Sequence, residues 1–240
     1  MLRNHLPKTL LFFALFLTGS TCKSQSELTA EQVYDLLNQS VVMIISTESN
    51  GNEDQGSGVI IMEGGYIATC NHLIENSTAI TVRHQNLEFK NADIITQDVQ
   101  NDIAIIKISA ENLIPVKVAD SDILKPGQKV YTISSPVGYE NTISEGIVSG
   151  LRKNKIKTTL IQTTAPITEG SSGGALINTN GELIGLLSSG KHEGSLYFSI
   201  PVNEIKSLFE TNSYGLNEQK SGNEDYGKKL KSVIKENEKK

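Results

Sequence analysis

GSSGGAL, at residues 170–176, sets Ser172 among glycines immediately before an apolar run. Glycine neighbours leave such a serine unobstructed, and the backbone N–H groups beside it remain accessible to a bound carbonyl oxygen. On its own the pattern is weak, because glycine and serine cluster in ordinary loops. The residues that follow are more informative, since the apolar runs 175–177 and 183–187 are separated by Asn180-Gly181. That dipeptide is typical of a β-hairpin, so we expect two strands after the serine.

The glycines around Ser172 also fit the G-x-S-x-G elbow of α/β hydrolases. In that elbow a helix follows the serine, and the acid and the histidine come later in the chain. Here strands are expected to follow, and the one later histidine is His192. A phosphate-binding loop would need Gly-Lys followed by Ser or Thr, which this stretch lacks. The context therefore argues against both interpretations.

Short apolar runs separated by Gly, Asn, Asp and Pro fill most of the chain. This pattern predicts an all-β sandwich or barrel, and the lack of long helices between the runs argues against a doubly wound α/β sheet. Short helices are expected at 30–38, behind a capping box at Thr29–Gln32, and again after Pro201. The expected strands are 41–45, 58–61, 66–69, 79–82, 92–95, 103–108, 130–133, 143–148, 159–162, 175–177, 183–187 and 196–200.

His72 and Asp102 lie upstream of the serine, each at the end of an expected strand. His72 follows the run 66–69, and Asp102 opens the apolar run 103–108. An aspartate that accepts a hydrogen bond from a histidine fixes its tautomer, and that histidine can then take the proton of a serine. Each residue alone has an ordinary explanation, as a surface histidine, a strand-capping aspartate or a loop serine. Together, in this order, they indicate a catalytic triad of His72, Asp102 and Ser172.

The segments around these residues resemble the HtrA/Deg family of trypsin-like serine proteases, from about Val41 to Phe209. The resemblance is carried by GSGVII with TCNH, by NDIAIIKI, by SPVG with NTISEGIVS, and by the run from IQT to GSSGGAL. It implies two six-stranded Greek-key β-barrels, at about 41–115 and 125–201, with the active site between them and short flanking helices. It further implies that the N–H groups of Gly170 and Ser172 form the oxyanion hole, and that polypeptides are the substrates.

Several positions depart from the pattern of this family. Ser171 stands where the family usually has Asn, and Cys70 stands where Ala or Asn is usual. Thr164 and Thr168 stand where Asp and Asn are frequent, which changes the loop that governs specificity. Beyond residue 210 the chain becomes rich in Lys, Glu, Asn and Ser, so we expect a disordered tail at 211–240 in place of a PDZ domain.

The residues expected to line the substrate pocket are uncharged. Pro166 occupies the position at which trypsin has its lysine- and arginine-selecting aspartate. Leu187 occupies the position at which glutamate-selective relatives have a histidine. We therefore expect a pocket for aliphatic or small side chains, lined by Pro166, Ile167, Leu187, Ser188 and Ser189.

The N-terminus has the pattern of an export signal. Arg3, His5 and Lys8 precede the apolar run 9–17 and a stretch of small residues that ends at Cys22. Such an arrangement predicts a signal peptide over 1–22, followed by a tether at 23–28, and the apolar run is short for a membrane span. Gly19 stands where a lipoprotein box usually has Leu, so lipidation of Cys22 is left open. The expected location is the bacterial cell envelope, either periplasmic or lipid-anchored, or outside the cell.

The composition narrows the remaining classes of function. A formal net charge of -5 and the absence of tryptophan argue against binding to nucleic acid. Two cysteines are too few for a disulfide framework. The histidines have no CxxC motif near them, so no metal is expected, and no other cofactor is expected either. The sequence thus predicts a serine endopeptidase, with a role in protein quality control. A catalytically silent homologue that binds or holds unfolded chains, or a general esterase, is the alternative, and a homotrimer is left open.

Overall fold

The computed structural model describes residues 27–136, 141–153, 159–191 and 196–211. The expected signal peptide, Cys22, His192 and the tail from 212 onward lie outside these residues. Within them, the chain contains no helix of the length and apolar character that a membrane crossing requires.

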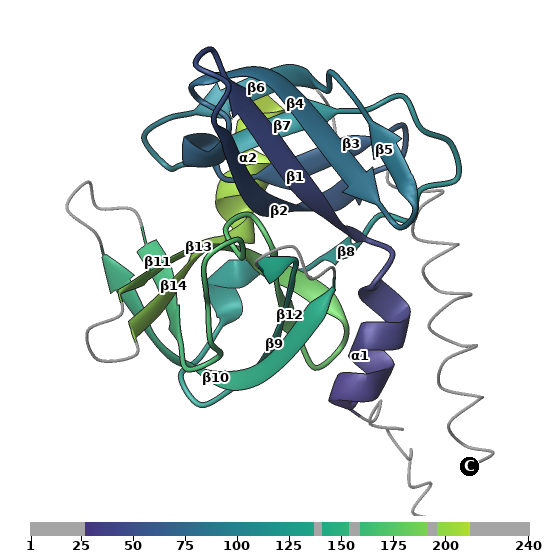
Figure 1. The fold of residues 1–240 in the computed structure, drawn as a ribbon. Coiled ribbons are helices and arrows are strands. Elements are labelled where there is room, and N and C mark those ends of the chain that lie inside the picture. Colours follow the sequence, from purple (N-terminus) through teal and green to yellow (C-terminus); the bar gives the residue numbers. More distant parts are fainter. Residues whose placement is uncertain (1–26, 137–140, 154–158, 192–195, 212–240) are drawn as a thin grey trace, which may run out of the picture.

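Two mainly antiparallel sheets, one above the other in Figure 1, make up most of the described structure. The first has the strand order β5-β4-β1-β2-β3-β7-β6. Its sequential neighbours are joined by short hairpins, such as the four residues between β1 and β2. The strands are β1 (Val41–Glu48), β2 (Glu53–Met62), β3 (Tyr66–Thr69), β4 (Ser77–His84), β5 (Leu87–Phe89), β6 (Asp93–Asp98) and β7 (Ile103–Lys107).

The second sheet has the order β12-β9-β10-β11-β14-β13-β8, and β12 also pairs with β13. This additional pairing closes six of its strands into a barrel, so that only the short β8 lies outside the ring. The strands are β8 (Lys117–Val118), β9 (Lys129–Ser134), β10 (Thr142–Lys153), β11 (Thr159–Thr163), β12 (Ala175–Asn178), β13 (Glu182–Lys191) and β14 (Leu196–Pro201).

The predicted all-β fold class is confirmed, and every predicted run contributes to a strand. Among the described residues each sheet has seven strands, one more than the six expected. The additions are β5, which has mostly exposed side chains, and β8, which pairs in parallel with β13 through two residues. The predicted strands 41–45 and 58–61 are longer in the structure, since β1 extends to Glu48 and β2 begins at Glu53.

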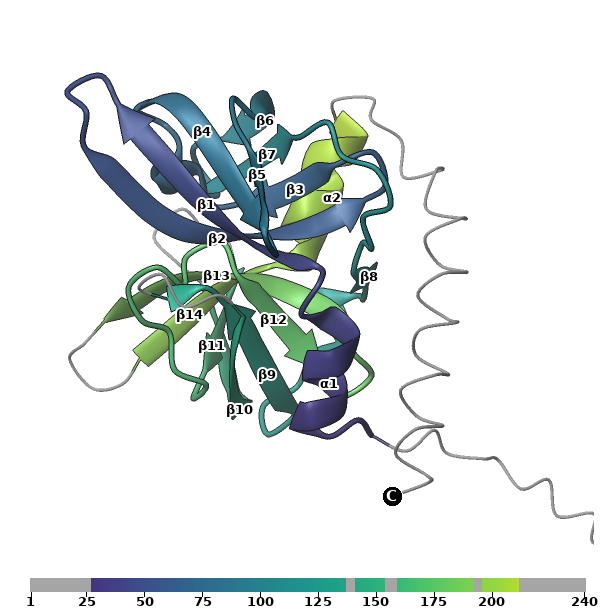
Figure 2. The ribbon, with the colours of Figure 1, turned by 45° about the vertical axis from the view of Figure 1, so that its right-hand side comes forward.

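Helix α1 (Ala30–Leu37) precedes the first sheet but packs on the second, as Figure 2 shows. Its N-terminus has the predicted capping box, in which the Thr29 hydroxyl accepts from Gln32 N–H and the Gln32 side chain accepts from Thr29 N–H. The chain before the helix is anchored to the second sheet, because the Tyr131 hydroxyl donates to the Leu28 carbonyl at 3.0 Å. The buried face of α1 consists of Val33, Leu36 and Leu37.

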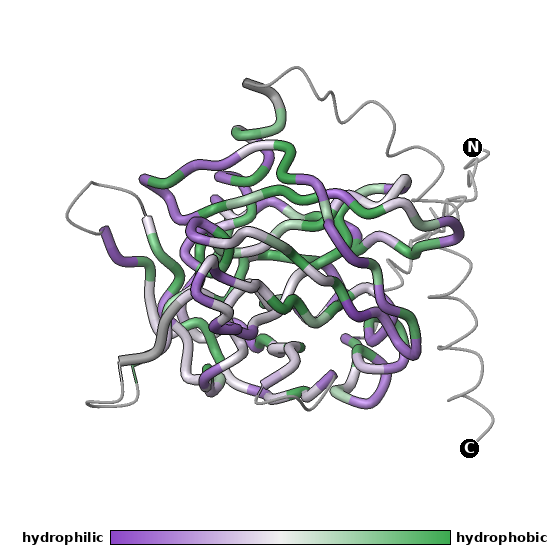
Figure 3. The backbone as a smooth tube through the Cα atoms, turned by 45° about the horizontal axis from the view of Figure 1, so that its top comes forward, coloured by the Kyte–Doolittle hydropathy of each residue, from purple (hydrophilic) through white to green (hydrophobic). Residues whose placement is uncertain are grey.

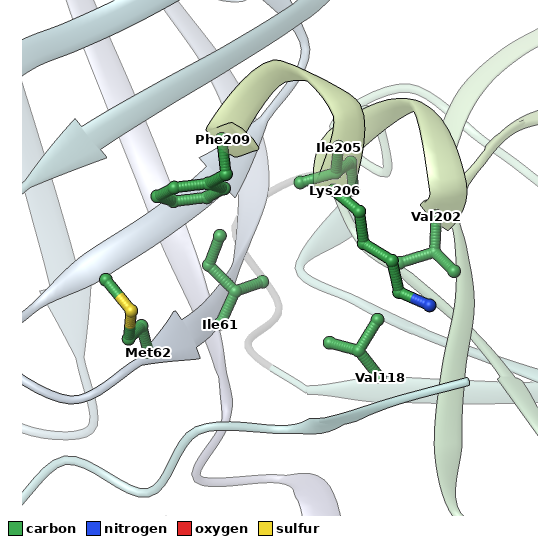
Figure 4. Close-up of a pocket in the computed structure, with 7 residues that line it drawn as sticks. All are labelled: Ile61, Met62, Val118, Val202, Ile205, Lys206 and Phe209. Atoms are coloured by element: carbon green, nitrogen blue, oxygen red, sulfur yellow. The ribbon is translucent and has the colours of Figure 1, made fainter. Parts of the chain in front are cut away.

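Helix α2 (Val202–Thr211) follows the last strand of the second sheet, contacts β13 and β14 of that sheet, and reaches the first sheet through Phe209. In Figure 4 Phe209 and Ile205 reach toward Ile61 and Met62 of β2, around a small apolar pocket that Val118, Val202 and Lys206 complete. The Phe209 ring also meets the Tyr66 ring edge-on, with 6.4 Å between the centroids. Helix α1 therefore links the start of the described chain to the second sheet, and α2 contacts both sheets.

Hydrophobic and hydrophilic stretches alternate along the chain in Figure 3, and the buried ones form three clusters. One cluster lies within each sheet. The third spans both sheets, with Val59 and Ile103 from the first, Tyr131 and Ile133 from the second, and Phe209 from α2. Burial of this shared cluster fixes the two sheets against each other, which is what a site at their junction requires.

Candidate active site

Two paired strands of the first sheet bring His72 and Asp102 together. His72 lies in the 3₁₀ turn Asn71–Leu73, directly after β3, and Asp102 directly precedes β7. Because β3 and β7 are antiparallel, with Thr69 opposite Ala104, the end of one strand meets the start of the other.

Asp102 binds His72 through both carboxylate oxygens. Oδ1 accepts from the His72 main-chain N–H at 2.8 Å, and Oδ2 accepts from Nδ1 of the ring at 2.8 Å. Since a carboxylate only accepts, Nδ1 carries the proton and Nε2 is left as the basic nitrogen. The backbone of Asp102 has φ +58°, a left-handed conformation that is uncommon outside glycine, and its carbonyl accepts from Asn71 N–H at 3.2 Å.

The pKa of His72 is raised above its ordinary value. The largest cause is the hydrogen bond to the Asp102 carboxylate, which favours the imidazolium. Partial burial of the ring opposes this, and the charges of Asp102, Asp54 and Glu75 add to the rise. The His72 side chain is 44% exposed, so it remains accessible to a substrate.

Ser172 lies in the loop between β11 and β12, on the second sheet. Its hydroxyl donates to the main-chain carbonyl of Ser188 at 2.9 Å. The Ser188 hydroxyl in turn donates to Asp102 Oδ2 at 3.3 Å. Ser188 therefore connects the three predicted triad residues, a role that the sequence did not indicate because a serine in the middle of a strand has no distinguishing pattern.

The loop around Ser172 approaches β2 so closely that glycine is required at 173. Gly173 has φ +82°, and a Cβ atom there would lie 2.1 Å from the Ser57 carbonyl oxygen. Gly170, the other residue of the predicted oxyanion hole, also has φ +82° and is buried. The backbone conformation and close packing of this turn thus explain why glycines flank the serine.

The residues predicted to line the substrate pocket differ in exposure. Ile167 and Leu187 belong to the buried apolar cluster of the second sheet, whereas Pro166 is exposed. The Ser188 side chain binds Asp102 and not a pocket, and Ser189 is described only through its backbone, which pairs with Phe198. A separate surface hollow next to Gly170 is acidic, and it is lined by Glu53, Asp54, Gln55 and Glu169.

Cys70 lies behind the predicted triad and is fully buried. Its thiol donates to the Leu187 carbonyl at 3.3 Å, and burial, followed by the charge of Asp102, raises the pKa of this thiol well above its usual value. Ligand atoms of Cys70, His72 and Asp102 lie within 4.8 Å of one another. A metal ion there would need an ionised Cys70 and the loss of the His72–Asp102 bond, which this environment opposes.

The chain is similar in sequence to known proteins. A family model described as a trypsin-like peptidase domain matches residues 56–186. The periplasmic serine endoprotease DegP of Escherichia coli K12 is 41% identical over 164 residues, which cover 64% of this chain and 34% of that protein. A probable periplasmic serine protease do/HhoA-like of Haemophilus influenzae is 40% identical over 167 residues, covering 65% and 36%. The chain thus spans about a third of the length of these relatives.

A solved structure of an HtrA-type protease, AlgW with a tripeptide, has a TM-score of 0.71 and 27% identity. It covers 76% of this chain, and 63% of its own length is matched. These findings confirm the resemblance to HtrA/Deg proteins that the motifs suggested. Because the family model covers more than half of the sequence, the chain belongs to the trypsin-like peptidase family.

Proposed function

We propose that this protein is a serine endopeptidase that cleaves polypeptides through an acyl-enzyme, with His72, Asp102 and Ser172 as its catalytic triad. The observation that carries the proposal is the paired contact of Asp102 with the N–H and the Nδ1 of His72, each at 2.8 Å. This contact orients the ring and leaves Nε2 free of a proton, which is the form that a general base requires.

Acylation begins when the Ser172 hydroxyl turns from the Ser188 carbonyl toward Nε2 of His72. Nε2 takes the proton as Oγ attacks the substrate carbonyl carbon, and the N–H groups of Gly170 and Ser172 stabilise the oxygen that becomes negative. The C–N bond then breaks, His72 gives the proton to the leaving amine, and Ser172 retains the acyl group. In the second half, His72 takes a proton from water as it attacks the ester, and Ser172 leaves with that proton.

The proposal also covers substrate preference, cellular location and domain organisation. Uncharged residues at 166, 167 and 187 support cleavage after aliphatic or small side chains. DegP relatives named as periplasmic support an exported location in the cell envelope, and quality control of envelope proteins is the proposed role. The proposed organisation is a signal peptide over 1–22, a tether at 23–28, a protease domain at 29–210 and a tail at 211–240. The last residue of the tether, Leu28, is buried against the second sheet, and the first residue of the tail, Thr211, ends α2. Lipidation of Cys22 and assembly as a homotrimer remain proposals.

The test is labelling of the mature protein with a fluorophosphonate, followed by peptide mapping. Labelling at Ser172 that His72→Ala abolishes would support the proposal, as would loss of peptide hydrolysis by about 10⁶-fold in Ser172→Ala. Ser40→Ala is the control, because it removes a buried hydroxyl whose Oγ has no hydrogen-bond partner among the described residues. Near-normal hydrolysis by Ser172→Ala would refute the assignment.

A binding role is the second candidate, and one observation favours it. The Ser172 hydroxyl donates to the Ser188 carbonyl, so the nucleophile is held by a group other than the histidine. A silent homologue would bind unfolded chains near Ser172 without cutting them. An unfolded protein added to the labelling reaction separates the two roles: a peptidase that is inactive at rest becomes labelled, whereas a holdase binds the unfolded protein and stays unlabelled.

A further inference from the structure

The side chain of Ser57, on β2, lies where the two sheets meet the loop of Ser172. Ser57 is fully buried. Its hydroxyl donates to the Gly170 carbonyl at 2.8 Å and accepts from the Ser135 N–H at 2.9 Å. Its main-chain N–H donates to the Ser172 carbonyl at 2.8 Å, and its own carbonyl accepts from the Thr69 hydroxyl at 2.7 Å. One residue of the first sheet thus binds the carbonyls on both sides of Ser171.

These contacts bear on the direction of the N–H groups in the loop. The carbonyls of Gly170 and Ser172 flank the peptide unit that carries the Ser172 N–H. The peptide unit between Gly170 and Ser171 is fixed at both ends, because its carbonyl accepts from Ser57 and its N–H donates to Thr168 at 3.0 Å. Rotation of this unit would turn its neighbours, including the units that carry the two proposed oxyanion donors.

Gly170 cannot hold this conformation by its own stereochemistry. Glycine populates both signs of φ about equally, so its observed φ of +82° must be selected by contacts from outside the turn. The Ser57 hydroxyl supplies such a contact from the first sheet. The buried hydroxyls of Ser40 and Ser199, by contrast, have no hydrogen-bond partner for Oγ among the described residues.

We propose that Ser57 is a positioning residue for the oxyanion hole. Its hydroxyl holds the Gly170 carbonyl, and thereby keeps the N–H groups of Gly170 and Ser172 directed to one point. The proposal rests on the proposed peptidase function, and it assigns to Ser57 no contact with the substrate. Since the oxyanion develops only in the transition state, loss of this hydroxyl should affect turnover more than substrate binding.

The experiment compares Ser57→Ala with Ser40→Ala, which removes a buried hydroxyl outside the site. For Ser57→Ala we expect kcat on a peptide substrate to fall by about 10- to 100-fold, as for a small misplacement of catalytic groups, with KM within about twofold. A peptide aldehyde, which forms an oxyanion on Ser172, should bind more weakly by a similar factor. Ser57→Cys, with a weaker donor of similar shape, should lie between, and Ser40→Ala should match wild type in all three readouts.

A second measurement separates this proposal from the peptidase function. Amide hydrogen exchange of Ser171, Gly173 and Gly174 should become faster in Ser57→Ala and not in Ser40→Ala, whether or not the protein cuts peptides. If the wild type neither hydrolyses peptides nor reacts with a fluorophosphonate, the peptidase function fails, and this exchange still decides whether Ser57 orders the loop. Should Ser57→Ala not fold, Ser57→Cys serves for both readouts. Unchanged exchange, or an unchanged kcat in an active enzyme, would overturn the proposal.

Discussion

Ser188 Oγ lies 3.3 Å from Asp102 Oδ2, so a strand of the second sheet reaches the aspartate of the first. The same oxygen accepts from His72 Nδ1 at 2.8 Å. Asp102 is thus bound from both sheets, and its orientation depends on how the sheets meet.

Removal of the Ser188 hydroxyl should weaken this orientation modestly. Ser188→Ala leaves in place the main-chain carbonyl that holds Ser172 and deletes one donor to Asp102. A hydrogen bond of this kind contributes about 1 kcal/mol, so kcat/KM should fall by roughly fivefold. Steady-state kinetics on a peptide substrate measure the change, with Ser40→Ala as the matched control. A loss as large as that of Asp102→Asn would show that we have misjudged which contact dominates.

Asp102→Asn should lower kcat by about 10⁴-fold with little change in the fold, because an amide can donate to the ring and select the wrong tautomer. The pKa of His72 should fall toward its ordinary value as the carboxylate is lost. NMR titration of the imidazole gives the pKa, and kinetics give kcat. Asp120→Asn, at the exposed N-cap of the 3₁₀ turn 121–123, should change neither quantity.

The activity should depend on pH through His72. The neutral ring is the active form, and Asp102 raises the pKa of His72, so kcat/KM should rise along an acid limb whose midpoint lies above 6.5. The sign for stability is opposite. Protonated His72 stabilises the folded state fully below its unfolded pKa, and this contribution disappears as pH rises through the folded pKa. An acid limb centred below 6.5 in a pH–rate profile would contradict the first expectation.

Gly173→Ala should destabilise the protein and disorder the loop of Ser172. A Cβ at this position meets the Ser57 carbonyl oxygen at 2.1 Å, in addition to the cost of a positive φ. Gly127→Ala is the matched control, since Gly127 has φ +91° with no atom within 4 Å of the added Cβ. The control should lose about 1 kcal/mol of unfolding free energy, and Gly173→Ala distinctly more. Urea denaturation measures both, and equal losses would exclude the steric explanation.

Much of the fold could be predicted from the sequence, because hydrophobic runs and turn residues are local signals. The predicted runs lie in strands, and His72 and Asp102 are in contact as their order suggested. What escaped prediction depends on partners distant in sequence. Two-residue β8 exists through its pairing with β13, and the hydroxyls of Ser57 and Ser188 acquire their roles from carbonyl and carboxylate groups more than 80 residues away.

The contacts that both ends of the described chain make with the opposite sheet have a consequence for unfolding. Residues ahead of the first sheet are anchored to the second by the Tyr131–Leu28 bond, and Phe209, from beyond the second, is packed against Tyr66 of the first. Each sheet is therefore held by residues that lie next to the other sheet in the sequence. A protease nick at 109–115, between the halves, would leave both fragments interlocked, and the two sheets should melt in a single cooperative transition.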